Sequence, residues 1–128
     1  MIKTSWQDFA ITGITVLFAV MLLPQLRDVL SRGAVLNFFS ALFTSLLGYS
    51  MALVFATLGL WISMVGQGLV ATVWMLLACF SLRNVRNRMF PDESLASVAL
   101  DFFTIWMRGV AFIVSGGVKE IFSRISRE

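Results

Sequence analysis

The side chains best able to bind a ligand in this sequence are uncharged and polar, and they lie within long apolar stretches. Gln67 stands out, because its amide offers hydrogen-bond donors and acceptors and is costly to bury unpaired. Together with nearby hydroxyl groups it is suited to hold a small polar solute, and the candidate substrate-binding residues are Gln67, Tyr49, Ser63 and Thr44. The alternative is that these groups pack and hydrogen-bond between helices.

The sequence lacks the groups that most enzymes and metal sites use. It has no histidine, and its single cysteine, Cys79, lies in an apolar stretch. No paired carboxylates and no nucleophile beside a base occur in those stretches. We therefore expect no enzymatic activity, no metal and no cofactor. The net charge of +3 arises from basic residues at the ends of apolar stretches, which indicates membrane topology rather than a nucleic-acid partner.

The distribution of charge along the sequence indicates that these side chains lie in a lipid bilayer rather than in water. The fifty residues from Gly33 to Leu82 contain no Asp, Glu, Lys or Arg. One helical crossing of a bilayer takes about 20 apolar residues, so this run fits two crossings joined by a tight turn. The chain of 128 residues is 59% hydrophobic and 13% charged, against about 25% charged in soluble domains. The sequence thus predicts an all-α integral membrane protein that has the lipid bilayer as a partner.

Three crossings are predicted, at about residues 9–26, 35–57 and 60–82. The first is interpreted as a retained span, because it is longer than the core of a signal peptide and follows Asp8 rather than a basic start. Gly59 is expected to form the turn between the second and third spans. We expect residues 1–88 to form a three-span transmembrane bundle, and residues 89–128 to form a C-terminal amphipathic helix and tail.

The arginines orient this bundle. With three crossings, two groups of arginines fall on one side of the membrane, namely Arg27, Arg32, Arg83, Arg86 and Arg88. The positive-inside rule places that side in the cytoplasm, so the N-terminus is predicted outside and the C-terminus in the cytoplasm, as in the inner membrane of a bacterium. Three tryptophans are expected near the membrane interfaces, at Trp6, Trp61 and Trp74.

The C-terminal segment has two possible placements. Pro91 and Ser94 predict a break followed by a helix start. Over residues 95–125 the polar side chains recur on one helical face, at Asp101, Thr104, Arg108, Ser115 and Lys119. Such a helix can lie in the membrane plane or on a partner, which we favour because a fourth crossing would carry an arginine through hydrocarbon. A fourth crossing with its polar stripe packed on a neighbour stays open.

Proline and glutamine close the first span. Pro24 removes one backbone hydrogen bond and kinks a helix, so Pro24 and Gln25 are candidates for a hinge, unless the proline simply ends the span. With three spans and an outside N-terminus, the sequence Leu23-Pro24-Gln25-Leu26 resembles the PQ-loop superfamily. It is similar to the bacterial half-transporters of sugars called SemiSWEETs, over roughly residues 8–85.

This resemblance implies a site and a mechanism. The family has a mid-membrane asparagine in its third helix and an aromatic residue, usually tryptophan, over the sugar. Gln67 and Tyr49 lie nearest to those places and depart from both residue types. Two copies would pair with a site between them near the midplane and alternate by rocking about Pro24. Transport would be facilitated, because the three spans carry no acidic group for proton coupling.

The sequence therefore predicts a homodimeric or larger homo-oligomeric facilitative transporter of a small, sugar-like polar solute. The alternative is a non-transporting membrane subunit, a scaffold or a holin-like oligomer that packs on partner membrane proteins in a larger membrane complex. The long C-terminal helix favours this alternative, because a half-transporter does not need it.

Overall fold

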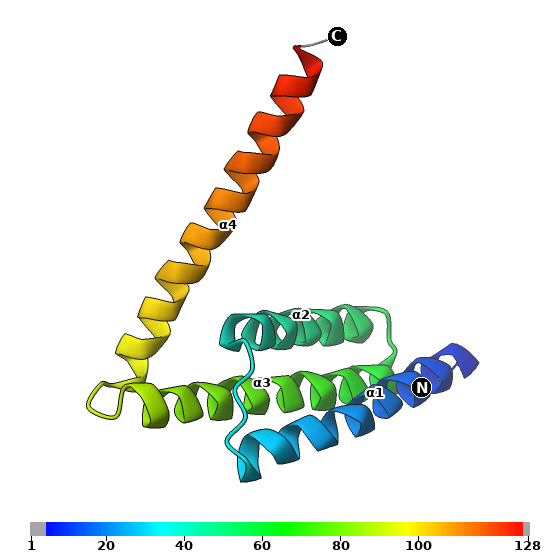
Figure 1. The fold of residues 1–128 in the computed structure, drawn as a ribbon. Coiled ribbons are helices and arrows are strands. Elements are labelled where there is room, and N and C mark those ends of the chain that lie inside the picture. The colour runs from blue at the N-terminus through cyan, green and yellow to red at the C-terminus, as the bar shows by residue number, and fades with distance from the viewer. Residues whose placement is uncertain (1–4, 127–128) are drawn as a thin grey trace. The chain divides into compact units, whose positions relative to one another are not determined.

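The computed structural model describes residues 5–126, except for the side chain of residue 121. These residues are helical apart from short connections and contain no strand, which confirms the predicted all-α class. All four helices are long and apolar enough to cross a membrane. They are α1 (Trp6–Ser31), α2 (Phe38–Thr57), α3 (Trp61–Met89) and α4 (Leu95–Ile125) (Figure 1).

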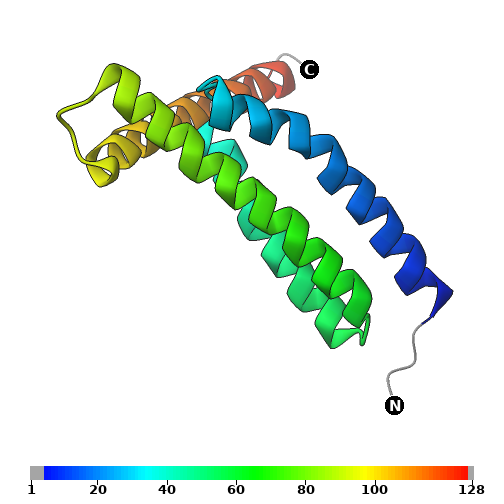
Figure 2. The ribbon, with the colours of Figure 1, turned by 90° about the horizontal axis from the view of Figure 1, so that it is seen from below.

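The chain divides after Pro91 into two compact units, and α3 lies at the centre of the first. Helix α1 packs on one side of α3 and α2 on the other (Figures 1 and 2). Asp8 of α1 contacts Ser63 at the start of α3, and Asn84 near the end of α3 donates to the carbonyl of Val29. Helices α1 and α3 therefore run parallel, and α2 runs antiparallel to both.

Both turns of the first unit use a glycine in the left-handed backbone region. Gly59, between α2 and α3, has a φ of +73°, and Gly33, after α1, has a φ of +65°. Residues with a Cβ rarely adopt these angles, so the predicted turn at Gly59 is confirmed with its physical reason. Asn37 then starts α2 as its N-cap, because its side chain accepts a hydrogen bond from the N–H of Ser40 at 3.2 Å.

One face of α3 holds the connection between α1 and α2. The hydroxyl of Ser81 accepts from the N–H of Leu36 at 2.7 Å and donates to the carbonyl of the same residue at 2.8 Å. One turn further on, the amide of Asn84 donates to the carbonyls of Val29 and Ala34 at 2.8 and 3.1 Å. These bonds satisfy backbone groups that have no helical partner, which matters where water is scarce.

Small residues let the three helices approach closely. Gly48 of α2 faces Ala71 of α3, where an added Cβ would lie 2.9 Å from the Ala71 Cβ. The fully buried hydroxyl of Ser45 donates to the carbonyl of Ala71 at 2.8 Å. Gly66 of α3 faces Thr12 of α1 in the same way. At these positions small residues and a hydroxyl group pack the helices together, as in other membrane bundles.

The outward faces of the first three helices are apolar. Leu17 and Met21 of α1 and Leu47 and Leu53 of α2 are each at least 66% exposed. Water-soluble proteins rarely leave such a continuous apolar surface uncovered, whereas hydrocarbon solvates it well. The exposed surface and the length of the helices together identify a membrane protein with transmembrane helices.

Helix α4 makes up most of the second unit. Ser94 caps it by accepting from the N–H of Ser97 at 3.1 Å, which is the predicted helix start. It is the most amphipathic of the four helices. Its 31 residues extend over about 46 Å, which suffices for a crossing. The predicted count of three crossings is therefore not confirmed, since the helix required for a fourth is present.

Candidate functional site

A hollow of about 840 Å³ lies over α3, with walls from all three helices of the first unit. Its lining is mostly apolar, and its polar side chains are the amides of Gln25 and Gln67 and the hydroxyl of Thr15. That hydroxyl donates to the carbonyl of Ile11 at 2.7 Å, which leaves the two amides as the groups free to meet a ligand. The lining consists of Ile11, Ile14, Thr15, Phe18, Met21, Leu22, Gln25, Met51, Phe55, Gln67, Val70 and Trp74.

A second hollow of about 410 Å³ adjoins the first. The two share Met51, Gln67, Val70 and Trp74, and the second adds Thr44. Within the described part of the chain the amide of Gln67 makes no hydrogen bond. Its polar atoms are not fully buried, so a ligand in the hollows can reach them. The structure therefore brings two of the four predicted substrate-binding residues to one place, with the amide of one of them unpaired.

Tyr49 and Ser63, the other two predicted substrate-binding residues, line neither hollow. The hydroxyl of Tyr49 is 2.9 Å from that of Thr72, so these two side chains link α2 and α3 elsewhere. Ser63 is fully buried, and both its N–H and its hydroxyl donate to the carboxylate of Asp8. The polar group of each residue is thus already paired within the chain.

Asp8 is a buried residue whose role the sequence did not reveal. It is the third residue of α1, and its side chain is fully buried against the first turn of α3. Its carboxylate accepts from the N–H of Ser63 at 2.8 Å and from the N–H of Ile62 at 3.4 Å. Helix α1 begins before the predicted span of residues 9–26, so this helix includes an acid that the span itself lacks.

Trp74 is a second residue whose place in the site the sequence did not reveal. It is predicted at a membrane interface, which stays a prediction. Trp74 lies in the middle of α3, where it borders both hollows. The usable signal was its spacing from Gln67, since residues seven apart lie on the same face of a helix.

The predicted hinge residues lie inside α1 rather than at its end. Helix α1 continues through Pro24 to Ser31, so this proline does not end the helix. Gln25 lines the larger hollow, while Pro24 lines a separate groove on α1. Figure 2 shows α1 curved along its length. A proline within a helix is the usual cause of such a bend.

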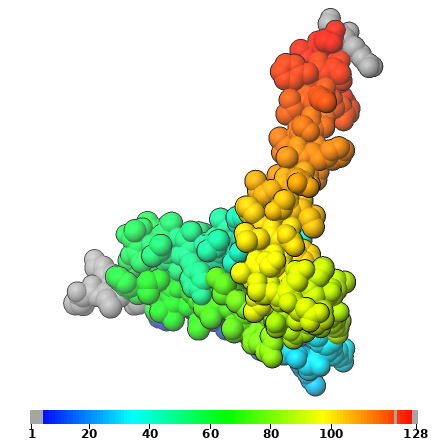
Figure 3. Space-filling view, turned by 90° about the vertical axis from the view of Figure 1, so that its left-hand side faces the viewer, coloured from blue at the N-terminus to red at the C-terminus, as the bar shows by residue number. Residues whose placement is uncertain are grey.

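The five arginines used to predict topology lie at one end of the first unit. Arg27 lies near the end of α1, and Arg32 follows it. The last turns of α3 carry Arg83, Arg86 and Arg88, and the guanidinium of Arg88 donates to the carbonyl of Arg32 at 3.0 Å. Figure 3 shows the atoms of these two helix ends against each other. Both arginine groups thus belong to one end of the unit, while its cytoplasmic orientation stays a prediction.

The remaining chemistry-bearing groups do not gather at one place. Among residues 5–126, no three His, Cys, Asp or Glu side chains come together as a metal site would require. Cys79 is exposed on α3. Comparison with known proteins finds no matching family model, curated protein or solved structure. The resemblance to the PQ-loop superfamily therefore stays a prediction from the sequence.

Proposed function

We propose that this chain is one part of a homo-oligomeric facilitative carrier for a small, sugar-like polar solute. The observation that carries the proposal is the unpaired amide of Gln67 at the boundary of two hollows. An amide in an apolar surrounding costs several kcal/mol unless it finds a hydrogen-bond partner. A solute with hydroxyl groups supplies such a partner when it enters, and releases it when it leaves.

A single copy offers too few polar groups to replace the hydration of a sugar-like solute. Besides Gln67, the hollows present the amide of Gln25 and the hydroxyl of Thr44, and the latter already donates to the carbonyl of Ser40 at 2.7 Å. A second copy facing the first doubles this set. The predicted resemblance to half-transporters points to the same arrangement.

We keep facilitated rather than proton-coupled transport in this proposal, although α1 contains two carboxylates, Asp8 and Asp28, because neither lines a hollow. Asp8 accepts hydrogen bonds from the start of α3 and lines neither hollow. A group that couples protons to transport must reach the solute path or lose its partners during the cycle. We therefore assign Asp8 to the joint between α1 and α3.

Uptake by reconstituted vesicles tests the role of Gln67. We expect vesicles with the wild-type chain to take up labelled monosaccharides, disaccharides or polyols down their gradient, without help from a proton gradient. Gln67→Ala should lower uptake roughly five- to a hundredfold, the cost of one unmade hydrogen bond in a dry site. Gln67→Asn keeps an amide and should retain part of the activity.

Two controls make this test specific. Gln7→Ala removes an exposed amide of α1 and should leave uptake unchanged. Tyr49→Phe isolates the hydroxyl that lies 2.9 Å from Thr72, and tests whether Tyr49 also touches the solute as the sequence predicts. Uptake that survives Gln67→Ala in a folded protein would overturn this assignment of the site.

The alternative function, a membrane subunit or scaffold, has one observation in its favour. Helix α4 forms a compact unit of its own and has the strongest separation of polar and apolar faces. A carrier has no need of such a helix, whereas a scaffold uses it to bind partners. The mass in mild detergent separates the two functions: a discrete dimer favours the carrier, and a large or mixed complex favours the scaffold.

A further inference from the structure

A groove of about 450 Å³ runs along the second half of α1 and shares no lining residue with the two hollows. The character of its lining changes along the helix. The part nearer the middle of α1 is apolar, and the part nearer its end is charged. The lining residues are, in this order, Val20, Leu23, Pro24, Arg27, Asp28 and Arg32.

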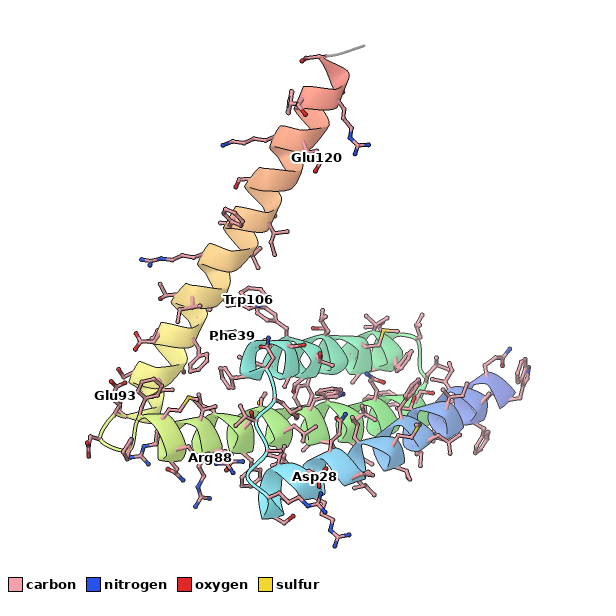
Figure 4. The ribbon with its side chains drawn as sticks, in the orientation of Figure 1. Asp28, Phe39, Arg88, Glu93, Trp106 and Glu120 are labelled. Atoms are coloured by element: carbon pink, nitrogen blue, oxygen red, sulfur yellow. The ribbon has the colours of Figure 1, made fainter. Side chains whose placement is uncertain are left out.

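The charged part of the groove keeps an excess of positive charge. Arg27 is exposed and has no ion pair within the described residues. Arg32 lies 3.5 Å from Asp28, but both side chains are largely exposed, and such surface pairs are weak. Arg88 of α3 does not line the groove, but its guanidinium lies beside it, since it donates to the carbonyl of Arg32 at 3.0 Å. Asp28 and Arg88 mark the two helix ends in Figure 4.

The groove extends from the level of the lipid headgroups to the level of the acyl chains. Arg27 and Arg32 lie where the uncharged part of the sequence gives way to charge, which is the level of lipid headgroups. Val20 lies seven residues before Arg27, about 10 Å deeper along the helix axis. A molecule that fills this groove therefore needs an anionic group at one end and a hydrocarbon chain at the other.

Pro24 adds a polar feature to the apolar wall. It has no N–H, so the carbonyl of Val20 lacks the donor that it would have in a regular α-helix. Both residues line the groove. This carbonyl lies at the depth of the acyl chain rather than of the headgroup, so it is not part of the anionic end of the groove.

We propose that this groove binds an anionic phospholipid, with its phosphate at Arg27 and Arg32 and an acyl chain along Val20 and Leu23. A free phosphate ion matches only the charged end and leaves the apolar wall empty. Phosphatidylglycerol fits both ends, because its phosphate is anionic and its acyl chains are apolar. The site is separate from the Gln67 hollows, so the inference does not depend on transport.

Native mass spectrometry of the full-length protein, titrated with single lipids in mild detergent, tests this proposal. The probes are phosphatidylglycerol, phosphatidylcholine with the same acyl chains, and glycerol phosphate as a headgroup without chains. We expect phosphatidylglycerol to bind more tightly than both. Each arginine near a lipid surface contributes about fivefold in affinity, so Arg27→Gln with Arg32→Gln should lower the preference for phosphatidylglycerol by more than tenfold.

Arg83→Gln is the matched control, because Arg83 is exposed at the same end of the unit but does not line the groove. It should keep most of the preference. Asp28→Asn removes the one acid of the groove, and should increase the preference without removing any packing. An equal loss in Arg83→Gln and in the double variant would overturn the proposal, as would wild-type protein that binds glycerol phosphate as well as the lipid.

Discussion

Asp8 on α1 caps the first turn of α3 across a sequence separation of 55 residues. Its carboxylate accepts from both the N–H and the hydroxyl of Ser63 and from the N–H of Ile62. Helix α3 begins after Leu60, which has no side chain able to cap it. The first turn of a helix leaves N–H groups without partners and carries a partial positive charge. Asp8 therefore completes α3 and joins the starts of two parallel helices.

Removing this cap should loosen the joint between α1 and α3. Asp8→Asn keeps the shape but loses the charge that the helix start favours, and Asp8→Ala loses the acceptors as well. We expect both variants to melt several degrees below the wild type in detergent, with the alanine variant lower. Asp28→Asn, a partly exposed acid on the same helix, is the control and should melt close to the wild type. Equal melting temperatures for all these proteins would contradict a capping role.

The contact between α2 and α3 depends on the absence of one side chain. A Cβ at Gly48 would lie 2.9 Å from the Ala71 Cβ and 3.3 Å from its Cα, so Gly48→Ala must push the helices apart. Overpacking of this kind costs about 1–3 kcal/mol. Gly68→Ala is the matched control, because nothing lies within 4 Å of its added Cβ, and alanine is the better helix former by about 1 kcal/mol. Unfolding by denaturant should separate the two variants clearly.

The connection after α1 depends on one buried hydroxyl. Ser81→Ala would leave both the N–H and the carbonyl of Leu36 without their partner. An unsatisfied buried group costs about 1–3 kcal/mol, so we expect a loss of stability in that range. Ser50→Ala is a fitting comparison, because this exposed serine bonds only within its own helix and its loss should change stability by less than about 0.5 kcal/mol. A similar small effect at both positions would argue against the role of Ser81.

Local signals in the sequence predicted the elements of this fold well. Glycine at 59 marked a left-handed turn, and serine at 94 marked the start of α4, since both effects depend on a few neighbouring residues. The long uncharged run predicted a helical hairpin, because its length fits two crossings. These signals do not tell which helices pack together, such as the parallel pair of α1 and α3.

The candidate site was predicted only in part, because its geometry depends on that pairing. Gln67 was found, since an amide in an apolar run is conspicuous in any arrangement. Asp8 looked like a flanking charge, because nothing local shows that Ser63 and Ile62 lie beside it. The place of Trp74 beside Gln67 was not predicted, because the hollows that both residues line form only when α1 and α2 pack on α3.

The arginines also predict which end of the bundle faces the cytoplasm, and cysteine labelling can test this. Cys79 is the only cysteine, so a Cys79→Ser background allows single cysteines to be placed at chosen sites. Ser31 is the last residue of α1 and Leu58 directly follows α2, so they lie at opposite ends of the first unit, and both are exposed. The arginines predict that Leu58→Cys reacts with a membrane-impermeant maleimide in intact cells, and that Ser31→Cys reacts only after lysis.

Ser126→Cys extends this experiment to α4. An in-plane or partner-packed helix keeps position 126 on the side of Ser31, so its cysteine should also react only after lysis. Reaction in intact cells would instead require a fourth crossing. That crossing would carry Arg108 and Lys119 into or through the bilayer, which is tolerated only when their polar face packs against protein. We expect protection in intact cells, because the polar stripe of α4 is then solvated by headgroups and water rather than buried in hydrocarbon.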